Sequence, residues 1–222
     1  MVMSGDSRTT ATRRQQVPDP QDSSKQMVVQ TDIVLSDAAE KLFLLHGRFG
    51  VGISGDAFLN DLPIAHYVHS FQAKAATPPT SVQNLSNDLL LYFRSLQPIP
   101  KLTLHVMGYD STTPFVFEVV VATNKVQRWN IDPTTNQAAY GILRSGDTAV
   151  VDRLLSQPQF TPAFQVMNVQ DAVDYSRHLI RTTIDQLRFE PRFSTVGGEI
   201  DTLVVTSSEG HFLARKALHV SS

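Results

Sequence analysis

His66 and His69 are spaced so that they could share chemistry, because they lie three positions apart in a segment that favours a helix. Side chains spaced in this way share one helix face and can hold a metal ion together. A third ligand nearby in the sequence would have to be Asp56 or Asp61, and no His-Glu-x-x-His or similar spacing occurs. Exposed helical histidines are common, so we expect no metal site and no cofactor.

The glycine-rich segment from Gly50 to Gly55 comes close to two catalytic motifs without matching either. It lacks the third glycine at the spacing that dinucleotide binding requires, and it is not the Gly-x-Ser-x-Gly of a nucleophile elbow. A close approach of the backbone at a strand-to-helix turn is sufficient to explain these glycines.

The composition excludes several classes of function. The chain has no cysteine, which rules out thiol catalysis, iron–sulfur clusters and cysteine-ligated zinc. A formal net charge of -2 gives no basic field for nucleic acid. No apolar run approaches the roughly 20 residues of a membrane span, and the N-terminus does not read as a signal peptide. Since there is no disulfide framework either, we expect a cytoplasmic protein without nucleic-acid or membrane partners.

The N-terminal half predicts strands followed by two helices. Residues 1–4 favour a strand, and the polar residues at about 7–24 favour a loop or an irregular hairpin tip. Two apolar runs at 41–45 and 49–53 predict a hairpin. A helix is expected from Ser54 or Asp56, with Pro63 near its first turns or at a kink. A second helix is expected after Thr80 or Ser81, ending before Pro98.

The C-terminal half repeats this order. Strands are expected at 102–108, 115–122, 125–130 and 138–142, then helices at about 147–156 and after Asn168, then a hairpin at 200–206 and 211–216. Paired helices between blocks of strands argue against a doubly wound parallel sheet. We expect a single domain over residues 1–222, of class α+β: an αββα sandwich of two antiparallel sheets with a pair of helices on each outer face.

Four segments in this order resemble proteasome β-type subunits, which are N-terminal-nucleophile (Ntn) hydrolases. "VMSGDSRTT" (2–10) is similar to the family's second strand. "EKLFLLHGRFGVGISGDAFLND" (40–61) is similar to its lysine strand, hairpin and turn. "YGILRSGDTAVVDRLL" (140–155) is similar to its Ser-Gly turn, and "GGEIDTLVVTSSEG" (197–210) is similar to its last strand and hairpin. These segments are spread from residue 2 to residue 210, and the resemblance covers most of the chain.

The resemblance implies roles for five residues. Asp6 matches the aspartate that pairs with the catalytic lysine, and Lys41 matches that lysine. Ser145 and Gly146 match the serine-glycine turn near the nucleophile's amine, and Gly55 corresponds to the glycine whose N–H helps form the oxyanion hole. Read without the family, Asp6 is equally a turn aspartate and Lys41 a surface lysine.

The chain departs from the family at two places. The aspartate and serine that often precede the last Gly-Gly are replaced at about Phe193 and Val196. The nucleophile strand, a threonine-headed segment that should precede residue 2, is not in the sequence. One hypothesis is that a GTG valine codon was taken as the start, so that the chain begins one strand late. The alternative is a paralogue without a nucleophile.

The resemblance therefore implies a subunit of a threonine-type peptidase that hydrolyses peptide bonds inside a self-assembled ring. Without the N-terminal threonine, the chain in this form is expected to be inactive. Implied partners are peptides or unfolded proteins, further copies of the chain in a ring, and an ATP-dependent unfoldase. The alternative functions are a non-catalytic structural or binding subunit of the same fold and, with less support, a small-substrate amidase.

Overall fold

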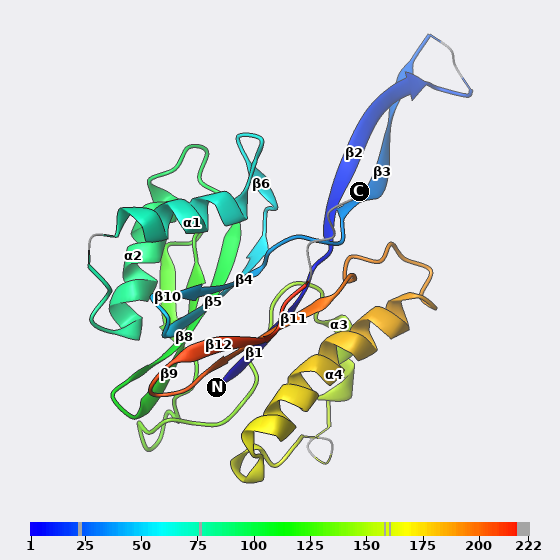
Figure 1. Cartoon of the computed structure of the whole chain (residues 1–222). Helices are drawn as coiled ribbons and strands as arrows, with labels where there is room; N and C mark the ends of the chain where they lie inside the picture. The colour runs from blue at the N-terminus through cyan, green and yellow to red at the C-terminus, as the bar shows by residue number, and fades with distance from the viewer. Residues whose placement is uncertain (22–23, 76, 158, 160, 217–222) are drawn as a thin grey trace, which may run out of the picture.

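Two antiparallel sheets lie face to face between two sets of helices in the computed structural model of the chain (Figure 1), which describes residues 1–21, 24–75, 77–157, 159 and 161–216. The larger sheet has the strand order β10-β9-β8-β5-β4, formed by Lys125–Arg128, Thr113–Val120, Leu102–Asp110, Phe49–Gly55 and Leu42–Leu45. The smaller sheet has the order β1-β11-β12, formed by Val2–Asp6, Ile200–Val205 and Gly210–Ala214. The expected α+β class with antiparallel sheets is confirmed at this level.

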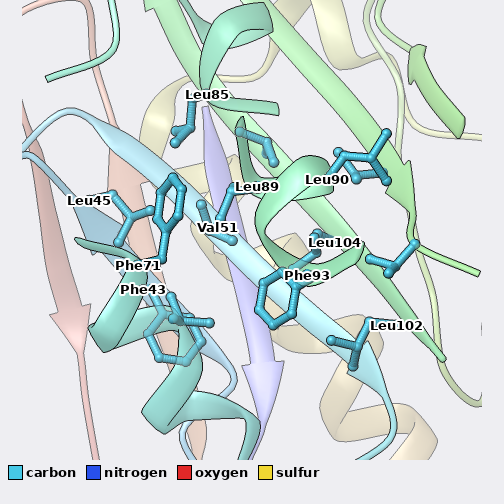
Figure 2. Close-up of a cluster of buried hydrophobic side chains, with 14 of the residues drawn as sticks. Phe43, Leu45, Val51, Phe71, Leu85, Leu89, Leu90, Phe93, Leu102 and Leu104 are labelled. Carbon is cyan, nitrogen blue, oxygen red and sulfur yellow. The ribbon is translucent and has the colours of Figure 1, made fainter. Parts of the chain in front are cut away.

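Helices α1 (Ile64–Lys74) and α2 (Val82–Arg94) cover the outer face of the larger sheet. Their apolar stripes meet the inward side chains of the sheet in the main core, of which Figure 2 labels Phe43, Leu45, Val51, Phe71, Leu85, Leu89, Leu90, Phe93, Leu102 and Leu104. Helix α2 begins as expected at Ser81, whose side chain accepts a hydrogen bond from the Asn84 N–H at 3.1 Å.

Helices α3 (Ala149–Leu154) and α4 (Val169–Leu187) lie on the other side of the molecule, with α4 packed on β1 and β11. Asn168 and Asp171 form a capping box at the start of α4, as the expected cap at Asn168 required. A short 3-10 helix, η2 (Phe164–Val166), precedes it. A second apolar cluster joins the two sheets and contains Leu42, Met107, Leu203 and Val205.

Strands β2 (Thr9–Pro18) and β3 (Gln26–Ser36) form a long antiparallel hairpin, called here the projecting hairpin, that stands away from both sheets (Figure 1). The expected polar loop at about 7–24 is thus largely strand. The sequence did not reveal β2 because most of its side chains are exposed, so that no buried face imposes an apolar alternation.

Two further sequence predictions were wrong. No helix starts at Ser54 or Asp56: β5 continues to Gly55, a small hairpin follows (β6, Phe58–Leu59; β7, Leu62–Pro63), and α1 begins only after Pro63. Asp56 is held by Lys101 instead, because its carboxylate accepts the Lys101 N–H at 2.7 Å. The expected strand at 138–142 is reduced to an isolated bridge between Ile131 and Ala138.

In the part of the chain that the structure describes, no helix combines the length and apolar character that crossing a membrane would require.

Candidate functional site

Asp6 and Lys41 form an ion pair in which the Lys41 Nζ lies 2.8 Å from the Asp6 Oδ1. Asp6 ends β1 in the smaller sheet, and Lys41 directly precedes β4 in the larger one. The pair therefore joins the two sheets. Both side chains are mostly shielded, with exposed fractions of 14% for Asp6 and 26% for Lys41. Such shielding preserves the attraction that solvent would screen at an open surface.

The backbone holds both partners in place. The other carboxylate oxygen of Asp6 accepts the N–H groups of Arg8, at 3.0 Å, and Gly197, at 3.1 Å. The Lys41 carbonyl accepts the Ile53 N–H at 2.9 Å, which ties the lysine to β5. Asp6 thus accepts two backbone hydrogen bonds on one carboxylate oxygen while its other oxygen faces the Lys41 ammonium group, an arrangement that orients the lysine.

Ser145 belongs to a second pair on the cavity wall, whose other member lies on β5. The hydroxyl groups of Ser54 and Ser145 are 2.9 Å apart, and Ser54 follows the Ile53 that contacts Lys41. Gly146 has a positive φ of 85°, and a Cβ built there would meet nothing within 4 Å. Within the described residues, Ser145 makes its hydrogen bond to Ser54 and not to Asp6 or Lys41.

Gly55 occupies a backbone position that only glycine tolerates. Its φ is 115°, and a Cβ would lie 2.1 Å from the Lys101 carbonyl oxygen. The close approach of two backbones expected at this segment is therefore present, at the end of β5 rather than at the start of a helix.

Asp147, directly after Gly146, is the centre of a network that sequence reasoning missed. Its carboxylate accepts hydrogen bonds from Arg192 at 2.5 Å and from Thr195 at 2.8 Å. Burial acts to raise the pKa of Asp147, but the hydrogen bonds from Arg192 and Thr195 and the Arg192 charge outweigh it and lower that pKa. This network joins the Ser145 turn to the segment before Gly197.

These groups line one cavity of about 1290 Å³ between β1, β5, α4 and the segment around residues 138–148. All five residues assigned by the resemblance lie on its wall: Asp6, Lys41, Gly55, Ser145 and Gly146. The wall is mixed in character, since Met3, Ile53 and Met107 contribute apolar surface beside the ion pair. The wall thus offers a ligand both charged and apolar surface.

The edge of β1 facing away from β11 is part of this cavity. The Val205 N–H donates to the Met1 carbonyl at 2.9 Å, so Met1 and Val205 form a hydrogen-bonded pair. Because such pairs alternate along an antiparallel ladder, Val2, Ser4 and Asp6 turn their backbone N–H and C=O groups the other way. In the described part of the chain β1 has β11 as its single neighbour, so this edge is open to an added strand.

The two histidines considered for a metal do not line this cavity, although the Glu40 that His69 contacts does. His69 Nε2 is 2.8 Å from a carboxylate oxygen of Glu40, and His66 Nε2 is 3.5 Å from the Ser70 hydroxyl. Among the described residues there is no group of three or more His, Cys, Asp or Glu side chains that could hold a metal ion.

A scan of protein-family models found none that matches this chain, and a search of curated proteins found no matching relative. The serine of "SGD" is typical of a helix cap, so the sequence gives no sign that Ser54 is the partner of Ser145.

Proposed function

We propose that this chain is a proteasome-like Ntn-hydrolase subunit of the threonine-peptidase type, which acts on peptides or unfolded proteins inside a ring of identical subunits in the cytoplasm. The chemistry would need a threonine hydroxyl beside a free α-amine, which a strand preceding residue 2 would supply. An ATP-dependent unfoldase would supply substrates too large to enter such a ring.

The Asp6–Lys41 ion pair on the cavity wall is the observation that carries this proposal. A lysine fixed by a carboxylate provides a positive charge that lowers the pKa of a nearby amine and hydroxyl. Asp6 at the same time prevents an uncompensated charge in a shielded site. The cavity offers room for a reacting peptide beside this ammonium group.

The open edge of β1 is the second support. A strand added there would lie against Val2, Ser4 and Asp6, and its end near Asp6 would lie beside Lys41. In that position a threonine would have the Lys41 ammonium on one side and the Ser54–Ser145 pair within the same cavity. Gly55 at the end of β5 would contribute to stabilising the oxyanion of the tetrahedral intermediate.

The test compares the peptidase activity of two proteins: this chain, and a version extended by the upstream coding sequence to the nearest threonine-bearing strand. We expect cleavage of fluorogenic peptides by the extended form alone, and loss of that cleavage in its Lys41→Ala variant. Lys125→Ala is the matched control, because Lys125 is an exposed lysine on β10, outside the cavity wall.

If neither protein cleaves the peptides while electron microscopy shows intact rings, the threonine-peptidase proposal is contradicted. That result would favour a non-catalytic subunit of the same fold. Cleavage of simple amides but not of peptides would favour a small-substrate amidase.

A further inference from the structure

The projecting hairpin is anchored firmly where it leaves the body. Arg8, just before β2, makes two hydrogen bonds to the Asp37 carboxylate, just after β3, at 2.7 and 2.8 Å. The Ala39 N–H donates to the Ser7 carbonyl at 2.9 Å, and Ser7 is fully buried. Beyond this base the two strands extend away from the sheets (Figure 1). A two-stranded hairpin without a packing surface is at best marginally stable in water, which indicates that it has a partner.

The alternation of hydrogen-bonded pairs along the hairpin shows which backbone N–H and C=O groups face outward. The Asp19 N–H donates to the Lys25 carbonyl at 3.0 Å, and Pro18, opposite Gln26, has no N–H to donate. The odd-numbered residues of β3 from 27 to 33 therefore bond to β2. The even-numbered ones, Gln26, Val28, Gln30, Asp32 and Val34, direct their backbone groups to the outer edge.

The two outer edges of the hairpin differ in chemistry. Strand β2 carries Arg13, Arg14 and Pro18, the residue types that keep an edge from pairing with other chains. Strand β3 has no lysine, arginine or proline over its 11 residues. Its single charge, Asp32, is bonded within the hairpin by the Thr12 hydroxyl at 2.6 Å. The edge of β3 is therefore the one suited to pairing.

The sequence of β3 is palindromic in polarity about Thr31. Reading outward from this residue, Gln30 matches Asp32 as a polar pair, and three apolar residues follow on each side, 27–29 and 33–35, before polar residues at 26 and 36. Such a pattern is complementary to itself when the strand runs antiparallel to an identical strand.

We propose that β3 pairs with β3 of a second copy of this chain, antiparallel and centred on Thr31, to form a four-stranded sheet with the order β2-β3-β3-β2. This proposal does not rest on the proposed function. In this register Val28 faces Val34 of the second copy, and Gln30 faces Asp32 of the second copy. All four positions are even-numbered, so the edge groups identified above bond to one another.

Pairing over residues 28–34 would form four hydrogen-bonded pairs, or about eight hydrogen bonds at two for each pair. It would also cover apolar side chains that are exposed in a single copy: the exposed fractions are 55% for Val28, 43% for Val34 and 37% for Val29. The two arginines and the proline of β2 then lie on the outer edges of the new sheet, where they prevent further growth. The result is a closed two-fold contact rather than a fibre.

The first test uses a matched pair of proline variants in the full chain. Gln30→Pro removes an N–H from the proposed interface, and Gln16→Pro removes one from the opposite edge of the same hairpin, where no pairing is proposed. Neither N–H contributes to β2–β3 pairing. We expect the mass by sedimentation velocity to halve in Gln30→Pro and to stay at the unmodified value in Gln16→Pro.

The second test does not depend on how proline is tolerated. Thr31 would lie opposite its own counterpart in a non-hydrogen-bonded pair, about 4.5 Å apart at Cα, which is within the range of a disulfide. The chain has no cysteine, so Thr31→Cys introduces a single thiol. We expect mild oxidation to produce a covalent dimer. Arg13→Cys is the control: it is paired with Thr31 within the hairpin, but its counterpart would be three strands away, roughly 14 Å.

A monomeric unmodified chain in sedimentation would overturn the proposal. So would an equal mass in Gln30→Pro and the unmodified chain, a halved mass in Gln16→Pro, or equal cross-linking of the Thr31→Cys and Arg13→Cys proteins.

Discussion

Lys41 and Asp6 meet across the interface of two sheets, with 2.8 Å between Nζ and Oδ1. Since Asp6 keeps two backbone donors whatever residue stands at position 41, removing the lysine would leave a bonded but unpaired carboxylate in a shielded site.

We therefore expect Lys41→Met to lower the free energy of unfolding by about 1–3 kcal/mol, because the aliphatic stem is kept and the charge is lost. Urea denaturation followed by circular dichroism measures this change. Lys125→Met, at an exposed position on β10, should leave the midpoint nearly unchanged. Equal effects of the two variants would show that the ion pair contributes nothing specific to stability.

Gly55→Ala should cost about 3 kcal/mol or more, because it combines a φ of 115° with a Cβ 2.1 Å from the Lys101 carbonyl oxygen. Thermal unfolding measures the loss. Gly141→Ala is the control, since a Cβ there meets nothing within 4 Å and its φ is not in the left-handed region. A Gly55→Ala protein as stable as its parent would contradict the close backbone approach described at the end of β5.

Asn168→Ala should remove the cap of α4 at a cost of about 1 kcal/mol, because both hydrogen bonds of the capping box depend on this residue or its geometry. Hydrogen exchange in the first turn of α4 should increase as well. Arg181→Ala, at an exposed site in the same helix, provides the comparison. Unchanged exchange after Asn168→Ala would exclude a role for the cap.

His105 predicts a dependence of stability on pH. Burial lowers the pKa of His105 below its ordinary value of 6.5, against a smaller opposing effect of Glu118, whose carboxylate is 4.0 Å away. The unfolded chain then binds a proton more readily than the folded one, so stability is complete above pH 6.5 and declines as the pH falls below it.

We expect His105→Gln to reduce this decline between pH 7 and about pH 5, as measured by urea midpoints at each pH. His211→Gln, at an exposed position on β12, should leave the slope unchanged. A slope that persists in full in His105→Gln would assign it to other groups.

Helices and buried strands could be predicted because burial leaves a periodic pattern in the sequence. The caps at Ser81 and Asn168 and the apolar stripes of α2 and α4 were identified in this way. The projecting hairpin could not, since neither face of it packs on the body and its polar residues follow no period. The end of β5 was misassigned because "SGD" is equally consistent with a helix cap and with a strand that ends at a glycine of positive φ.

The site was predictable only in part, for a similar reason. The closeness of Asp6 and Lys41, 35 positions apart, was inferred from a resemblance and not from spacing. The partners of Ser145 and Asp147 are Ser54, Arg192 and Thr195, which come from distant segments that only the tertiary structure brings together. Nothing in the local sequence of these residues marks them as neighbours.

Because Asp6 belongs to one sheet and Lys41 to the other, their separation depends on how the two layers are aligned, and no hydrogen bond within either ladder fixes it. A slip of one layer along the other would break the ion pair while both sheets kept their internal bonds. Such a slip would have to loosen the apolar cluster of Leu42, Met107, Leu203 and Val205 that joins the two layers, so this cluster and the Ser7–Ala39 backbone hydrogen bond keep the ion pair formed.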